Sequence, residues 1–288
     1  MDVFDDPTVH TCIIGLSKNK SLLKTNIRKQ VWSKDELNST FIDAINLVGI
    51  IDTTSYSINI TLSFSERVLF DKLNKFKPLK EICHIRQCIK TGNDIEYVIK
   101  SNVKLAEPWK KGLRGKGIGR YLIVEDDLYL KYGPFLARNW NNISFYETPK
   151  IAVRETGKRI IATLDLENRY FLSSLYSIYP LKEFDIDFLK SLLAIINSNL
   201  ATFYIRKIAF DLTEGAFTKV RTNQLGRLPI PPIDEHIIKI FSVKVDQILL
   251  FKARDSNTDI SSLESEIDQL VYELYGLTED EIKIVESR

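Results

Sequence analysis

The sequence predicts an α+β fold, with a mixed, β-rich domain, a long amphipathic helix and a C-terminal helical hairpin. Short apolar runs separated by Gly, Asn and charged turns begin at Leu79, which is typical of β structure. Apolar residues recur at helical spacing from Asp185 to Ile205 and on two further segments after Asp234. The chain has 288 residues, of which 44% are hydrophobic, and this composition fits one or two globular domains.

The first 78 residues carry mixed patterns. Val9–Leu16 reads as a buried strand very near the start, so we expect residues 1–30 to be the edge of a larger domain whose upstream part paired with this strand. We interpret residues 31–78 as a connector. Its predicted segments are a short helix at 34–45, an alternating stretch at 55–63 and a helix at 66–76 that ends before Pro78.

Residues 79–233 form the predicted β-rich domain, and its turns carry cations. Thr91-Gly92-Asn93 reads as a turn, and Pro149–Ile161 reads as a hairpin with Lys158 and Arg159 near its tip. Asp211–Arg221 forms a further glycine-containing basic loop. The prolines of Leu228–Pro232 require extended backbone, and we place a domain boundary there.

Residues 234–288 are predicted to be helical. The helices 234–253 and 262–275 each have an apolar face, so they can pair antiparallel. Ser261 with Glu264 and Thr278 with Glu281 have the spacing of capping boxes. Gly276 stands where a helix ends in positive φ, so we expect this acidic region to be ordered.

Charge is strongly segregated, although the net charge of the chain is only +2. Residues 80–125 carry a net charge of +5, whereas residues 255–288 carry a net charge of −8. A basic middle and an acidic end predict that a polyanion binds the middle of the chain.

The segment Glu107–Tyr121 holds five cations, four glycines and two aromatic residues. Glycine lets a backbone approach a partner closely, and Lys and Arg displace counterions from nucleic-acid phosphates. We therefore predict a DNA-binding loop here, with Trp109 and Tyr121 anchoring it to the core. The predicted phosphate ligands are Lys90, Lys110, Lys111 and Lys116; the predicted base readers are Arg114, Arg120, Arg154 and Arg159; and Thr91, Gly92, Lys158, Lys219 and Arg221 complete the set.

No other chemistry stands out. The three cysteines lack a zinc-like spacing and are expected to be buried thiols, and the histidines form no ligand set or triad. No apolar run reaches 18 residues and the N-terminus is acidic, so we expect a cytoplasmic protein without a membrane partner. The carboxylates at 125–127 and at 165 and 167 lack the partners that a nuclease site needs.

Several blocks together resemble a TaqI-like target-recognition domain. They occur in the same order as in that family, and the ending 267–278 is the most specific match. Such domains form the C-terminal part of type IIG restriction-modification enzymes and of related adenine-N6 DNA methyltransferases. The blocks are 108–121, 149–154, 193–198, 228–231 and the closing segment Ile267–Thr278, and the opening 3–14 is similar to the end of a methyltransferase domain.

The resemblance implies that residues 79–233 recognise double-stranded DNA by clamping it opposite a methyltransferase lobe of the same enzyme. That lobe would bind S-adenosylmethionine, and a fused nuclease would use Mg²⁺. This chain has neither the glycine-rich loop after a strand nor the Asn-Pro-Pro-aromatic motif that such catalysis needs, so we predict no catalytic residue and no cofactor in it.

Two alternatives remain open. A type I specificity-like subunit would act as a scaffold that recruits separate methylase chains, but such subunits normally carry two recognition domains separated by long helices. A standalone enzyme with an unrecognised site would bind S-adenosylmethionine or a divalent metal. The DNA site recognised and the oligomeric state do not follow from the sequence.

Overall fold

The structure, a computed structural model, describes residues 62–140, 142–209 and 218–287 and the backbone of four short strands before them. The chain divides into two compact units, 1–67 and 68–288. In the first unit, β1 (Lys24–Ile27) pairs antiparallel with β2 (Asp43–Asn46), and β3 (Ile51–Asp52) pairs with β4 (Ser57–Ile58). The end of the predicted helix 34–45 is therefore a strand. The rest of that helix and the predicted strand 9–16 lie outside the described residues.

Helix α2 (Phe64–Leu73) confirms the helix predicted at 66–76, although it ends three residues earlier. Its Phe70 ring stacks on Tyr204 with the ring centroids 4.7 Å apart. Lys72 Nζ donates to the carbonyl of Gly276 at 2.5 Å and to Glu281 Oε2 at 2.6 Å. Residues 68–78 thus pack with the second unit. The start of that unit at Val68 lies within residues 31–78, the segment that we interpreted as a connector.

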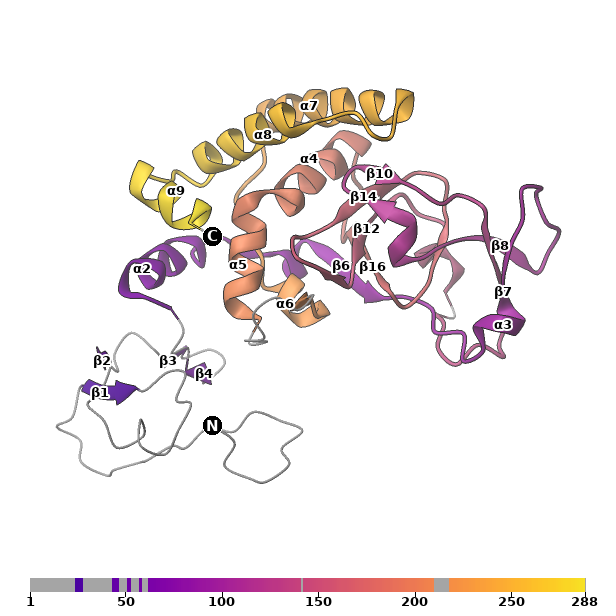
Figure 1. Ribbon diagram of the computed structural model, residues 1–288, viewed down its shortest axis with the longest axis horizontal. Coiled ribbons are helices and arrows are strands. Elements are labelled where there is room, and N and C mark those ends of the chain that lie inside the picture. The colour runs from indigo at the N-terminus through magenta and orange to yellow at the C-terminus, as the bar shows by residue number, and fades with distance from the viewer. Residues whose placement is uncertain are drawn as a thin grey trace. The chain divides into compact units, whose positions relative to one another are not determined.

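Two four-stranded sheets form the β-rich part of the second unit (Figure 1). One is antiparallel throughout, in the order β14-β12-β16-β6. The other has the order β15-β8-β11-β7, with β15 parallel to β8. The strands are β6 (Cys83–Gln87), β7 (Val98–Lys100), β8 (Trp109–Leu113), β11 (Leu128–Lys131), β12 (Lys150–Arg154), β14 (Ala162–Asp165), β15 (Tyr170–Phe171) and β16 (Leu175–Pro180).

Short elements connect and extend these sheets. The β12–β14 pair confirms the predicted hairpin, with its second strand beginning at Ala162. Gly92 has φ +84°, which confirms the turn at 91–93. The others are β5 (Lys77–Pro78), β9 (Ile118–Gly119), β10 (Leu122–Ile123), β13 (Thr156–Gly157), β17 (Thr218–Lys219), β18 (Pro229–Ile230), α3 (Asp94–Tyr97), α6 (Thr222–Gly226) and the 3₁₀ helices η2 (Leu79–Glu81), η3 (Gly115–Gly117) and η4 (Ile143–Phe145).

The core joins the two sheets. One apolar cluster combines Leu113 of β8 with Ala152 of β12 and Phe171 of β15. Cys83 and Cys88 are buried and free, and burial raises the pKa of each thiol to about 12. These two cysteines are therefore inert packing residues, as predicted; Cys12 lies outside the described residues.

The predicted long helix 185–205 is two helices, α4 (Ile186–Asn197) and α5 (Asn199–Ile208), bent by 59°. The break is at Ser198, whose ψ of 160° is extended and whose hydroxyl accepts from the Ala201 N–H at 3.1 Å. The apolar residues keep the same helical spacing through both helices, so the sequence pattern did not predict the break. Among the described residues no single helix could span a membrane; only this bent pair passes by length and composition, and most of its side chains are buried in the core.

The C-terminal helices confirm the predicted hairpin. Helix α7 (Glu235–Arg254) is followed by α8 (Ser261–Leu274) and α9 (Glu279–Glu286) (Figure 1). Lys244 of α7 pairs with Glu266 of α8. The capping box of Thr278 and Glu281 and the positive φ of Gly276 are confirmed. The capping box predicted for Ser261 is wrong, because α8 is capped at Ile260 and Glu264 binds Arg120 instead. Residues 68–288, on both sides of the predicted boundary at 233, form one compact unit.

Candidate nucleic-acid interface

The two lysines of β8 are already paired with acids. Lys110 Nζ lies 2.7 Å from Glu107 Oε1 and 3.7 Å from Glu147 Oε1. Lys111 Nζ lies 2.7 Å from Asp126 Oδ2 and 3.4 Å from Glu167 Oε2. The hydrogen bond with Glu107 raises the pKa of Lys110. These predicted phosphate ligands must therefore exchange an acidic partner for a phosphate before they can bind DNA.

The arginines of the same segment also face inward. Arg114 is 3.5 Å from Glu125, and its Nε is buried. Arg120 donates from Nε to Glu264 Oε1 at 2.5 Å and from Nη1 to the carbonyl of Ile160 at 3.0 Å. Arg120 therefore ties this segment to α8. Lys116 is exposed and forms no ion pair with another described residue.

The glycines of this segment allow close internal packing. Gly115 and Gly117 are buried, and the N–H of Gly115 donates to Ser174 Oγ at 2.8 Å. A Cβ at Gly115 would lie 3.0 Å from the carbonyl oxygen of Ser174. Tyr121 is buried at φ 58°, which confirms its predicted anchoring role, and Trp109 is half-buried. We predicted a backbone open to phosphates, but these two glycines are covered by protein.

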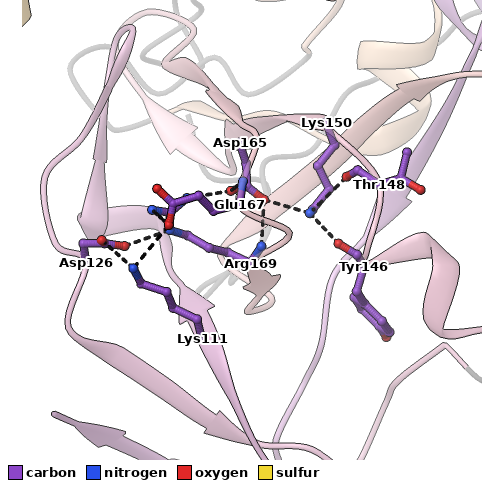
Figure 2. A network of polar contacts seen from close by, with 8 residues as sticks. All are labelled: Lys111, Asp126, Tyr146, Thr148, Lys150, Asp165, Glu167 and Arg169. Atoms are coloured by element: carbon purple, nitrogen blue, oxygen red, sulfur yellow. Dashed lines mark hydrogen bonds and ion pairs between the residues drawn. The ribbon is translucent and has the colours of Figure 1, made fainter. Parts of the chain in front are cut away.

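A buried ion network holds the neighbouring strands (Figure 2). Asp165 accepts from Lys150 Nζ and from Arg169 Nη1, both at 2.8 Å, and all three side chains are at least nine-tenths buried. Arg169 Nε continues to Asp126 Oδ1 at 2.8 Å, and Asp126 meets Lys111. This network was not predicted from the sequence, although the i, i+4 spacing of Asp165 and Arg169 is compatible with an ion pair.

Burial and neighbouring groups of opposite charge shift the pKa values of this network in opposing directions. Burial lowers the pKa of Lys150, although the adjacent Asp165 carboxylate opposes this effect. Burial acts to raise the pKa of Asp126, but hydrogen bonds from Arg169 and Lys111 outweigh it and hold that pKa below its usual value. The carboxylates at 126 and 165 thus serve as internal counterions.

A second basic region forms where the hairpin loop meets residues 218–221. β13 pairs with β17, and the N–H of Val220 donates to the carbonyl of Glu155 at 2.9 Å. Lys219 Nζ lies 3.0 Å from Glu155 Oε1. This pairing gathers four predicted residues from two distant segments, namely Arg154, Lys158, Lys219 and Arg221. Arg159 instead reaches Asn199 Oδ1 at 3.1 Å and Glu264 Oε2 at 4.0 Å.

An open groove of about 550 Å³ lies between β6 and α6, and we call it the β6–α6 groove. The β5–β18 pair and the hydrogen bond from the Leu79 N–H to the carbonyl of Leu228 hold its two walls together. Because α6 directly follows Arg221, the groove begins where the second basic region ends. It is lined by Lys80, Cys83, His84, Ile85, Arg86, Leu181, Thr222, Asn223, Gly226 and Arg227. None of these residues is among the predicted DNA ligands, because the two segments that form the groove meet only in the fold.

The turn at 91–93 forms a separate small feature. Lys90 is exposed, and its backbone bridges to Arg138. Thr91 is buried and its hydroxyl donates to Asp94. Thr91 therefore shapes the turn, and the side chains that face solvent there are those of Lys90 and Asn93.

Residues 110–230 match the family model of the TaqI-like C-terminal specificity domain. This part of the chain is therefore similar to a TaqI-like specificity domain, and the match covers less than half of the 288 residues. The structure of MmeI, a type IIL restriction-modification enzyme in complex with DNA, is similar with a TM-score of 0.53 at 11% identity, covering 74% of this chain and 37% of that chain. The type IIG restriction endonuclease BpuSI is similar with a TM-score of 0.46 at 12% identity, covering 81% of this chain and 36% of that chain. A search of curated proteins found no match.

The mixed α+β fold predicted from the sequence is confirmed, and MmeI shares this fold over 74% of the chain. The chain spans about a third of the length of MmeI and of BpuSI. The matched range holds β8, the buried network and the second basic region, and it includes the α6 wall of the groove. Within the described residues, no group of three His, Cys, Asp or Glu side chains is placed to hold a metal ion.

Proposed function

We propose that this chain recognises a specific site in double-stranded DNA as the specificity part of an adenine-N6 DNA methyltransferase of a restriction-modification system. The observation that carries the proposal is the match of residues 110–230 to the TaqI-like specificity domain. The cations of the second basic region, at the end of a rigid hairpin, support it, because loops on a fixed scaffold are suited to reach a DNA groove.

The proposed division of labour leaves chemistry to a methyltransferase lobe of the same enzyme. That lobe would bind S-adenosylmethionine and hold the flipped adenine, since the motifs for both are missing from this sequence. A fused nuclease, where the parent enzyme has one, would use Mg²⁺. Such an enzyme would act on DNA in the cytoplasm.

Recognition would divide between phosphate contacts and base contacts. Lys158, Lys219 and Arg221 are suited to phosphates, and Arg154 at the end of β12 is suited to a guanine edge. A bidentate arginine contact of this kind discriminates between bases by about 1–3 kcal/mol. Lys90 and Lys116 would add phosphate contacts from exposed turns.

Selection from a random duplex library tests sequence specificity. The chain is incubated with duplexes carrying a randomised central stretch, and bound DNA is sequenced after several rounds at moderate salt. We expect a short shared sequence to emerge, and the Arg154→Gln variant should relax preference at one position while leaving the others unchanged. A bound pool that stays random would contradict a specificity function.

Thermal-shift titration with S-adenosylmethionine and with Mg²⁺ tests the division of labour. We expect no shift of the unfolding temperature with either ligand, since the proposal places both binding sites in the rest of the enzyme. A saturable shift would overturn it in favour of a complete enzyme with an unrecognised site.

A further inference from the structure

Beyond the predicted residues, the β6–α6 groove has the chemistry of a phosphate-backbone site. Its lining supplies the cations Lys80, Arg86 and Arg227 and the neutral donors Thr222 and Asn223. None of the lining residues in the described part of the chain is acidic. Lys80 and Arg86 form no ion pair with a described residue, whereas Lys110, Lys111, Arg114 and Arg120 of β8 and the adjoining loop each lie within 4 Å of a carboxylate.

Arg86 is held rigid before any ligand arrives. Its guanidinium carbon lies 4.1 Å from the ring centroid of Phe145 and 4.7 Å from that of Trp140. Its Nε donates to the hydroxyl of Tyr179 at 3.0 Å, and Trp140 is itself fixed by a bond from Nε1 to the carbonyl of Gln87 at 3.0 Å. No described atom accepts a hydrogen bond from the Arg86 Nη groups. A guanidinium fixed in this way loses little conformational freedom when it forms two parallel bonds to a phosphate.

The groove itself is firmly built. Gly226 lets α6 approach closely, since a Cβ there would lie 3.3 Å from Lys80 Cβ and 3.5 Å from Ile85 Cδ1. Partial burial, and after it the charge of Arg86, lower the pKa of His84, so that side chain is neutral at pH 7 and can donate or accept. The walls are therefore preformed, and the positive charge comes from residues whose charge does not change near neutral pH.

We propose that the β6–α6 groove binds the sugar-phosphate backbone of one strand of duplex DNA, with Arg86 as its anchor and Lys80 and Arg227 beside it. This inference rests on the proposed DNA function and adds a contact surface to it. The groove continues the second basic region through Arg221, so one strand would run from the hairpin loop along α6. A duplex is favoured over a free anion, because the cations line an open groove and do not enclose a pocket.

Duplex binding by the whole chain tests the groove. A labelled random-sequence duplex of about 20 base pairs is titrated at several salt concentrations with the wild type and with Lys80→Gln/Arg86→Gln. We expect the variant to bind at least tenfold more weakly and to lower the slope of log affinity against log salt by about 2. The matched control is Lys239→Gln/Arg254→Gln on α7, which makes the same charge change and should leave binding unchanged.

The outcomes separate the groove from the function. Wild-type affinity in the groove variant would overturn the groove and leave the DNA function standing, whereas a wild type that binds no duplex would overturn both. Arg86→Lys keeps the charge but removes the rigid planar guanidinium, so we expect this variant to bind the duplex several-fold more weakly than the wild type. Inorganic phosphate at millimolar concentration should not compete; equal competition would make the groove a simple anion site.

Hydrogen exchange of the wild type avoids any effect of the variants on folding. Saturating duplex should slow amide exchange in residues 80–87 and 222–227. Protection that appears only in residues 107–121 would overturn the groove assignment.

Discussion

The β8 loop, residues 107–121, and the β6–α6 groove are both basic, but they use their cations in opposite ways. In the loop, Lys110 pairs with Glu107 of the loop itself, Lys111 and Arg120 pair with carboxylates from other segments, and two of the glycines are covered by protein. In the groove, Arg86 is fixed by aromatic rings, and no acidic residue of the described part of the chain lines the wall. The comparison teaches that a basic, glycine-rich sequence can serve internal packing, because carboxylates within the loop and elsewhere in the chain pair with its cations.

We expect the largest loss of stability from breaking the buried ion network beside the loop. Asp165→Asn leaves Lys150 and Arg169 without their shared counterion, so we expect a loss of about 3–5 kcal/mol in the free energy of unfolding. Urea unfolding measures it. The control is Glu167→Gln, which removes an exposed partner of the same network and should cost less than about 1 kcal/mol. Equal losses in the two variants would mean that the buried charges are not coupled as described.

Gly115→Ala tests whether the glycines of the loop serve packing. The added methyl group would meet the Ser174 carbonyl, and we expect a loss of about 1–3 kcal/mol in unfolding free energy with duplex affinity unchanged. Gly119→Ala is the matched control, because its nearest neighbours lie 3.7 Å or more away. A fall in duplex affinity without a fall in stability would instead support the original prediction that the loop backbone contacts phosphates.

Asp268 on α8 tests the acidic side of this joint between the loop and α8, because it lies among the acids near Arg120 and Arg159. Burial raises its pKa from 3.8 to about 6, despite the hydrogen bond from the Asn199 N–H. Because the folded state favours the protonated form, this group's contribution to stability is complete below pH 4 and is lost as the pH rises through 6. Asp268→Asn should therefore gain about 1–2 kcal/mol relative to the wild type between pH 5 and pH 7.5. A constant difference in urea-unfolding free energy across that range would contradict the shift.

The smallest effect should come from releasing the loop lysines. Glu107→Gln/Glu167→Gln removes exposed partners of Lys110 and Lys111, so we expect duplex affinity to rise up to about fivefold, with a steeper salt dependence. Glu273→Gln/Glu279→Gln makes the same charge change on α8 and α9 and is the control. Unchanged affinity relative to that control would show that the loop takes no part in binding.

Local signals in the sequence were sufficient for much of the fold. Periodicity predicted α7 and α8, turn chemistry predicted Gly92 and Gly276, and the hairpin of β12 and β14 was found with a shifted second strand. The break at Ser198 was missed, because a capping serine inside one continuous apolar stripe leaves the helical period intact.

The candidate site was less predictable, for a physical reason. Composition identified where cations are dense, but ion pairing depends on partners such as Glu264, which lies 144 residues from Arg120. The groove likewise depends on β5 meeting β18 and on α6 packing beside β6. Charge density is a property of a segment, whereas an available charge is a property of the folded surface.

The contact between α2 and the segment 276–281 has a consequence for how this unit could evolve. Lys72 binds the Gly276 carbonyl and Glu281, so the first residues of the second unit lie beside the segment that joins α8 to α9. A unit with adjacent ends can be grafted into another host protein without stretching the host's own chain. Under the proposed function, exchanging such a unit between two enzymes would transfer a DNA-sequence preference in a single recombination event.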